Sequence, residues 1–201
     1  MKILIKSPNT TSHFLHFLVE FKDYTPTLLR LPSWRPGRYE LQNFSQYIRE
    51  IKFYSGENQI KVERIDKDTY QIPKTSNLRL EYQYYANQMD AGSSFVDLNQ
   101  IYINFINCIF QPLGFEDNGI EIEIENKKEF KIATSLKNTN NFLYSKSYFE
   151  LIDSPLIYSS QLQKKSFTVQ EYTFHLWING NCTPNWETLI HEFELYTKEQ
   201  L

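Results

Sequence analysis

The sequence has few of the residues and motifs that usually indicate a function. Its 201 residues contain six glycines, two cysteines and four histidines. No G-x-S-x-G elbow, glycine-rich phosphate loop or Walker-type lysine occurs, which excludes the commonest hydrolase and nucleotide-binding motifs. The net charge of −3 is small and no block of like charges is present. This charge pattern argues against a nucleic-acid footprint and against a membrane-surface patch.

The cysteines and the N-terminus limit the cellular compartment. Cys108 and Cys182 lack the C-x-x-C spacing of metal and redox sites, so each is expected to be a lone thiol, although a disulfide stays open. The apolar run after Met1 is far too short for a signal peptide, and no window has the length of a membrane span. We expect a cytoplasmic protein without a membrane partner, or a periplasmic or secreted one if a signal peptide has been removed.

Hydrophobic and aromatic residues, which form protein cores, are abundant. Hydrophobic residues make up 41% of the chain and aromatic residues 16%, so a large core is available and disorder is not expected. No hydrophilic linker divides the chain. We therefore expect one β domain over residues 1–183, followed by a terminal helix over residues 184–201.

Alternation of apolar and polar residues predicts the strands. The cleanest segment is 120–125, where isoleucines should face the core and glutamates the solvent. The run at 13–21 mixes periods, so its centre is expected to be buried on both faces. The other predicted strands are 3–6, 27–31, 47–54 with a bulge, 59–65, 69–72, 78–85, 95–109, 130–134, 156–159, 165–169 and 172–178. A polar turn is expected at 7–12, and a short helical turn or strand at 148–152.

A helix is predicted over residues 183–196. Thr183 is expected to cap it, and Pro184 to occupy its first position. Apolar side chains recur there at intervals of three and four residues and share one face: Trp186, Leu189, Ile190 and Phe193. Together these patterns predict a mainly β fold, an antiparallel β-sandwich of about ten or more short strands with a C-terminal helix.

The most restricted stretch is residues 31–39, Leu-Pro-Ser-Trp-Arg-Pro-Gly-Arg-Tyr. Its second proline and its glycine fit the central positions of a type II turn, which predicts a rigid corner leaving a strand. Two interpretations stay open: the aromatic side chains pin the corner to the core, or they form a contact surface with the arginines. The candidate contact residues are Pro32, Trp34, Arg35, Pro36, Gly37, Arg38 and Tyr39.

The histidines do not complete a metal motif. His191 is followed by a glutamate, as in the helical zinc motif H-E-x-x-H, but the fourth position on is Leu195. His13 and His16 lie three residues apart, which on a strand places them on opposite faces. We therefore expect no metal ligand and no cofactor in this chain.

No catalytic group stands out either. The glutamates of 120–125 share one face that is expected to be exposed to solvent, so we interpret them as a solvated surface. Ser93 and Ser94 have no histidine nearby in sequence, although a partner in space stays open.

Several motifs, in order, resemble a known family. Residues 32–39 are similar to the P-x-W-x-P-G-x-Y signature in the N-terminal domain of glycyl-aminopeptidase-type zinc metallopeptidases, the metallopeptidase family numbered sixty-one. Residues 66–70 resemble its D-K-x-T-W turn, with Tyr70 in place of the tryptophan. Residues 78–86, 148–155 and 174–180 resemble its V-x-V-x-Y-x-V-Y-A strand, its Y-D-x-L-x-D-S-P segment and the strand that follows.

The resemblance implies a non-catalytic accessory domain. In that family this β-rich domain precedes a thermolysin-like catalytic domain, which binds zinc through H-E-x-x-H and a downstream glutamate. The implied partner is thus a catalytic metallopeptidase domain of the same polypeptide, on which this domain would pack and shape substrate access. Zinc is expected only there, and residues 184–201 would begin the link to it.

Alternatives to this accessory role remain. The chain is either a domain of a longer enzyme or a free-standing relative. The aromatic content also allows a stand-alone module that binds glycans or extended peptides. A third possibility is an enzyme with its own unrecognised site, involving Ser93 or His175.

Overall fold

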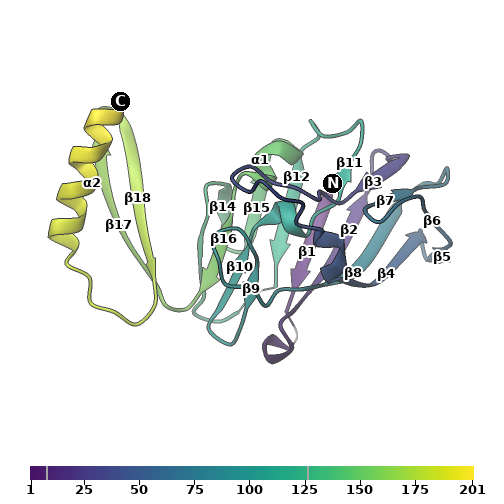
Figure 1. Cartoon of the computed structure of the whole chain (residues 1–201), viewed down its shortest axis with the longest axis horizontal. Coiled ribbons are helices and arrows are strands. Elements are labelled where there is room, and N and C mark those ends of the chain that lie inside the picture. The colour runs from purple at the N-terminus through teal and green to yellow at the C-terminus, as the bar shows by residue number, and fades with distance from the viewer. Residues whose placement is uncertain (8, 126) are drawn as a thin grey trace.

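The computed structural model describes residues 1–7, 9–125 and 127–201 and consists mostly of strands, as Figure 1 shows. The largest sheet has eight strands in the order β14-β15-β12-β1-β2-β8-β4-β5. Its strands are β1 (Lys2–Lys6), β2 (Phe14–Phe21), β4 (Ile48–Ser55), β5 (Asn58–Ile60), β8 (Leu78–Tyr85), β12 (Ile120–Ile124), β14 (Lys137–Thr139) and β15 (Phe142–Ser145). Neighbouring strands are antiparallel except β1 and β12, which pair in parallel.

Two four-stranded sheets and four short helices complete the sandwich. One sheet contains β13 (Lys131–Ala133), β16 (Leu156–Ser159), β10 (Gln100–Ile103) and β9 (Phe95–Val96). The other contains β11 (Gln111–Pro112), β3 (Leu28–Arg30), β7 (Thr69–Gln71) and β6 (Glu63–Arg64). The short helices are η1 (Thr10–Ser12), η2 (Phe44–Tyr47), η3 (Phe105–Asn107) and α1 (Tyr148–Ile152). The predicted sandwich with a C-terminal helix is confirmed.

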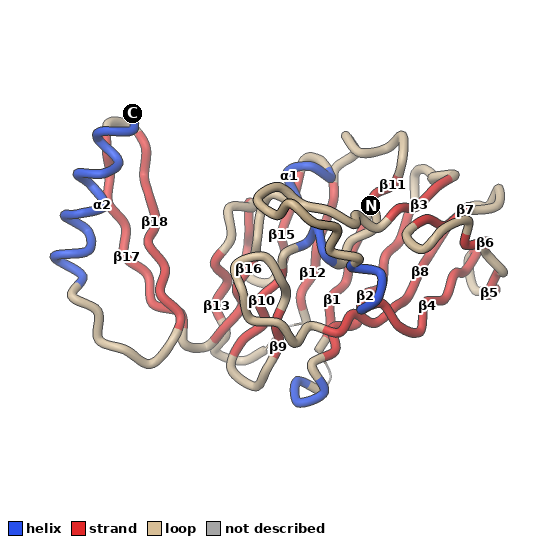
Figure 2. The backbone as a smooth tube through the Cα atoms, in the orientation of Figure 1, coloured by secondary structure: helices blue, strands red, loops and turns tan. Residues whose placement is uncertain are grey.

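The last three elements stand apart from the sandwich. They are β17 (Leu162–Val169), β18 (Tyr172–Asn179) and α2 (Trp186–Gln200). The two strands form a separate two-stranded sheet, and α2 packs against β17. Figures 1 and 2 show this unit, which we name the arm, projecting from one end of the sandwich.

The pairing of β2 with β8 forms the centre of the large sheet. Alternate residues of both strands are buried, and the rings of Phe17 and Tyr82 stack across the pair with centroids 5.1 Å apart. The expectation that the centre of 13–21 is buried on both faces is wrong, because the intervening side chains, such as Leu18, stay partly exposed on the outer face. His13 lies outside the strand, in left-handed conformation at the end of η1.

The alternation in β12 has the predicted outcome. Its three isoleucines are buried and Glu121 is exposed. Glu123 lies 3.7 Å from the Lys2 ammonium on the neighbouring strand. These carboxylates therefore belong to a charged outer surface.

Some predicted boundaries are wrong. The expected strand 59–65 is divided into β5 and β6, and 95–109 into β9, β10 and η3. The predicted bulge is present in β4, where the register shifts between Arg49 and Lys52. In the expected turn at 7–12, Thr10–Ser12 form η1, and position 8 lies outside the described residues.

The start of the C-terminal helix also differs from the prediction. Helix α2 is capped by Asn185, whose side-chain oxygen accepts from the Thr188 backbone N–H at 3.2 Å. Thr183 is therefore not the cap, and Pro184 precedes the helix. Asparagine is a strong N-cap residue, so it decides the start.

Two buried tyrosines, one from β8 and one from α1, bond to the segment that follows η3. Tyr82 donates to the Cys108 carbonyl at 2.7 Å and Tyr148 donates to the Ile109 carbonyl at 3.0 Å. Burial raises the pKa of both phenols well above the ordinary value. The Cys108 thiol is buried and free, and Cys182 is exposed and free.

Replacing Tyr82 with phenylalanine tests this connection. Tyr82→Phe leaves the Cys108 carbonyl buried without its donor, so we expect the free energy of unfolding to fall by about 1–3 kcal/mol. Tyr85→Phe is the control, because within the described residues its hydroxyl bonds to the exposed Asn87 amide and to no buried group. Urea denaturation of both variants measures the difference, and an equal effect would contradict the proposed connection.

Candidate functional site

The Pro-rich corner is a loop held between two buried side chains. Leu31 before it and Phe44 after it are both in the core. The Leu31 N–H donates to the Asp68 carbonyl at 2.8 Å, and the Gln42 N–H closes the loop on the Ser33 carbonyl at 2.7 Å. Backbone bonds at its base therefore fix the loop in place.

The turn at the tip has the expected conformation. Gly37 has φ of +85°, the positive value that the third position of a type II turn requires. The Trp34 indole N–H donates to the Arg38 carbonyl at 2.7 Å and bridges the turn. A side chain of the corner thus stabilises its own backbone.

The aromatic side chains of the corner do not reach the core. Trp34 is 48% exposed and Tyr39 is fully exposed. The interpretation that they pin the corner to the core is therefore wrong, since Leu31 and Phe44 perform that role. Leu41 is exposed as well, so the corner presents apolar groups to the outside.

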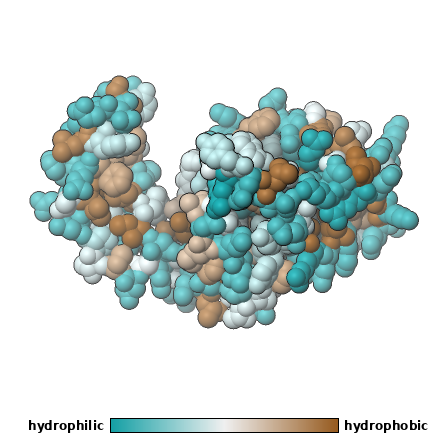
Figure 3. Space-filling view, viewed as in Figure 1, coloured by the Kyte–Doolittle hydropathy of each residue, from teal (hydrophilic) through white to brown (hydrophobic). Residues whose placement is uncertain are grey.

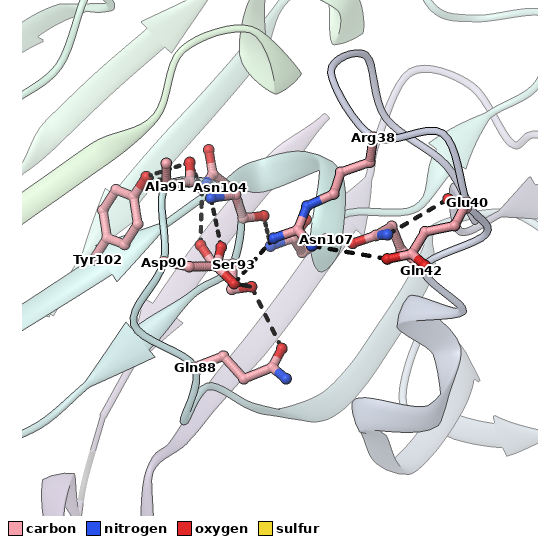
Figure 4. Close-up of polar contacts among 11 residues, drawn as sticks. Arg38, Glu40, Gln42, Gln88, Asp90, Ala91, Ser93, Tyr102, Asn104 and Asn107 are labelled. Carbon is pink, nitrogen blue, oxygen red and sulfur yellow. Dashed lines mark hydrogen bonds and ion pairs between the residues drawn. The ribbon is translucent and has the colours of Figure 1, made fainter.

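The arginines attach the corner to the loop at residues 87–94. Figure 4 shows Arg38 reaching across to Asp90, with 3.3 Å between Nη2 and Oδ2. The same guanidinium lies 3.8 Å from Glu40. Arg35 packs directly on Gly92, where an added Cβ would lie 1.3 Å from its Nη2. Only glycine allows this close approach.

Two asparagines hold the 87–94 loop in turn. Asn104 donates to the Ser93 carbonyl at 2.8 Å, and the fully buried Asn107 donates to the Gly92 carbonyl at 3.0 Å. Neither asparagine was predicted as a functional residue from the sequence. The signal available was their polar side chains inside the apolar run 101–110.

Asp90 organises this loop as well as binding Arg38. Its carboxylate accepts from the Gly92 N–H at 2.7 Å and from the Ser93 hydroxyl at 2.9 Å. Desolvation is the largest single effect on the Asp90 pKa and raises it, but these hydrogen bonds and the Arg38 charge together lower the pKa below its ordinary value. The carboxylate is therefore charged at neutral pH.

We name the resulting area the corner surface. It consists of Trp34, Tyr39 and Leu41 from the corner and Met89 from the second loop, all exposed. The Arg38–Asp90 contact joins the two loops. Rigid, exposed aromatic groups beside an arginine are typical of protein contact surfaces.

The candidate catalytic residues do not form a site. Ser93 bonds to Asp90 and Gln88, whereas His175 lies on the arm with Nδ1 2.8 Å from the Ser166 hydroxyl. The structure does not bring Ser93 and His175 together.

Nor do the histidines fit a metal. The His13 Nδ1 lies 2.6 Å from the Val96 carbonyl, and His191 is exposed on α2. Within the described ranges, no group of three or more His, Cys, Asp or Glu side chains could hold a metal ion.

Among the described helices, none is long and apolar enough to cross a membrane.

Comparison with known proteins decides the family. The family model described as the peptidase M61 N-terminal domain matches residues 2–160. The chain belongs to this family. The resemblance seen in the ordered motifs is therefore confirmed, and the match ends just before the arm begins at Leu162.

A solved structure shares the fold of this M61 N-terminal domain. An aminopeptidase N family protein from Idiomarina loihiensis matches with a TM-score of 0.90 and 20% identity, covering 99% of this chain and 36% of that chain. The chain thus spans about a third of that protein's length. An M1 zinc metallopeptidase from Deinococcus radiodurans matches with a TM-score of 0.42 and 12% identity, covering 93% of this chain and 49% of that one. A search of curated proteins gave no significant match.

The Arg38–Asp90 contact can be tested directly. Asp90→Asn removes the charge that Arg38 binds, so we expect the Gln42 amide to exchange its hydrogen about two- to fivefold faster, as for loss of an exposed ion pair. Because the folded-state pKa of Asp90 lies below 3.8, the contact holds above that pH and is lost as pH falls through the lower value.

The control for that experiment is Glu40→Gln. It removes only the longer contact of 3.8 Å, so the Gln42 amide should exchange at nearly the original rate. Hydrogen exchange followed by NMR between pH 3 and pH 6 measures both variants. Equal rates in Asp90→Asn and the unsubstituted protein would show that Asp90 does not hold the corner.

Proposed function

We propose that this chain is the non-catalytic accessory domain of an M61-type zinc aminopeptidase-like protein. It packs on the catalytic domain of the same polypeptide and shapes substrate access to it. The observation that carries this proposal is the corner surface, where a rigid loop presents exposed aromatic groups. The family to which the chain belongs supports the identity of the partner.

The corner surface is built for contact. Truncating a fully exposed aromatic side chain has little effect on folding, so a contribution to stability does not explain Tyr39. Trp34 has a structural role through its bond to the Arg38 carbonyl, and about half of its surface is still free for contact. Their loop is fixed before any partner arrives, because Arg38 and Asp90 join it to the second loop. A preorganised surface loses little conformational entropy on binding.

The shape of the molecule offers a place for the catalytic domain beside the corner surface. Figure 3 shows an open notch between the sandwich and the arm. In Figures 1 and 2 the corner loop extends along the sandwich toward this notch. A catalytic domain seated in the notch would contact the corner on one side and the arm on the other.

Zinc chemistry belongs to that catalytic domain in this proposal. The described residues of this chain include no group suited to bind zinc, so we assign them no step of peptide hydrolysis. Their contribution is to limit how a peptide approaches. Rigid loops at the border of a cleft act in this way by excluding substrates that do not fit.

The role of the corner is tested with the separate domains. The 201-residue chain and the peptidase domain encoded downstream in its reading frame are mixed, and calorimetry measures their affinity. We expect Tyr39→Ala to weaken binding at least tenfold, about 1.4 kcal/mol. Unfolding free energy should change by less than about 0.5 kcal/mol, because the ring is fully exposed.

Phe142→Ala is the matched control. Phe142 is another exposed aromatic residue, 52% exposed, on β15 of the large sheet and outside the corner surface. Binding should be unchanged in this variant. The proposal fails if no peptidase domain follows in the reading frame, or if Tyr39→Ala and Phe142→Ala bind equally well.

A further inference from the structure

The arm has two long strands and no partner for either outer edge. β17 and β18 pair with each other along their full length, from Leu162 opposite Asn179 to Val169 opposite Tyr172. Neither strand pairs with any other strand of the described chain. An unpaired edge presents free N–H and C=O groups, which can bind another strand.

β18 differs from every other edge strand in the described residues. The edge strands of the three other sheets are β14, β5, β13, β9, β11 and β6, and each is two or three residues long. β18 has eight residues, Tyr-Thr-Phe-His-Leu-Trp-Ile-Asn, with no Lys, Asp, Glu, Pro or Gly. Proteins usually protect a free edge with short strands, charges or proline. β18 has none of these protections.

β17, by contrast, carries such protection. Lys164 and Lys165 are exposed near its centre, and α2 packs against this strand. A strand approaching β17 would meet two positive charges and the helix. The arm therefore offers a single edge suited to pairing, that of β18.

The apolar face of the arm is also incomplete. Phe167 and Val169 of β17 are buried, and the Phe167 ring stacks on Phe174 of β18 at 5.4 Å. Leu176 and Ile178 lie on the same face by the register, yet they are only partly buried. This apolar strip continues across β18 beyond the area that α2 covers.

Helix α2 shows the same lack of cover. None of its residues is buried, although it has the apolar face predicted from the sequence. Phe193, near the middle of that face, is 42% exposed. A helix of this kind gains most of its stability from packing, so further contacts are needed on this side.

We propose that β18 is an internal strand of the complete polypeptide. A strand of the peptidase domain pairs with its free edge and covers the apolar strip, so the arm is the first layer of the peptidase domain. This inference rests on the proposed function. It moves the domain boundary from the expected residue 183 to about residue 160, where the family match ends.

The solved relative supports this occupant over a second copy of the chain. It contains the fold of 99% of this chain, the arm included, within a chain nearly three times longer. The additional polypeptide is thus present on the same chain as the arm. Intramolecular pairing has a far higher effective concentration than pairing between two molecules.

Hydrogen exchange tests the pairing itself. The 201-residue chain is compared with the longer polypeptide that includes the downstream peptidase domain. We expect the outward-facing amides of β18, every second one along the strand, to exchange at least a hundredfold more slowly in the longer polypeptide. The amides that β18 donates to β17 serve as the internal reference. Equal exchange of the outward-facing amides in both proteins would overturn the proposal.

Two adjacent substitutions test the apolar strip. Leu176→Lys places a charge on the strip, whereas His175→Lys places the same charge on the opposite face of the same strand. In the longer polypeptide that includes the peptidase domain, we expect Leu176→Lys to speed the exchange of the outward-facing β18 amides at least tenfold and His175→Lys to change it by less than twofold. Equal exchange in both variants would overturn the proposal.

The outcomes separate this inference from the proposed function. If Tyr39→Ala weakens binding and Leu176→Lys leaves the exchange of the β18 amides in the longer polypeptide unchanged, the arm inference fails and the accessory role stands. If neither substitution has its expected effect, both fail. If the 201-residue chain forms a dimer that Leu176→Lys dissociates, the edge binds a second copy, which also overturns the proposed occupant.

Discussion

The register between β2 and β8 is the constraint on which the rest of the structure depends. Eight consecutive pairs, from Phe14 opposite Tyr85 to Phe21 opposite Leu78, set which side chains face the core. A slip of one residue would turn every buried side chain of a strand to the solvent. The same register directs the Tyr82 hydroxyl to the Cys108 carbonyl, and so places the segment that begins with η3.

The corner surface is a consequence of that placement. η3 contains Asn107, which holds the loop after β8 through the Gly92 carbonyl. Asp90 of this loop then binds Arg38, 52 residues earlier in the chain. Each of these contacts is a single polar interaction of ordinary length. Together they connect the centre of the sheet to an exposed loop and hold that loop in one position. A rigid surface of this kind suits a domain whose role is to bind another domain.

The sandwich and the arm manage their strand edges differently. In the sandwich, edge strands are short, and few of their backbone groups are free to pair. In the arm, an eight-residue strand without charge or proline is left open. The same physical rule, that exposed edges bind other strands, thus explains why the edge strands of the sandwich are short and why the edge of β18 is suited to a partner strand. The end of the family match near residue 160 agrees with this difference.

The sequence by itself determined the local elements and the family. Period-two alternation located β8 and β12, the proline and glycine located the turn at the corner, and ordered motifs identified the M61 N-terminal domain. These features are local, because a strand period or a turn conformation is set by neighbouring residues. Only the tertiary structure decided that Trp34 and Tyr39 are exposed, that Asn104 and Asn107 hold the corner's partner loop, and that β17 and β18 leave the sandwich. The physical reason is that burial depends on what covers a side chain, and the covering residues lie far away in sequence.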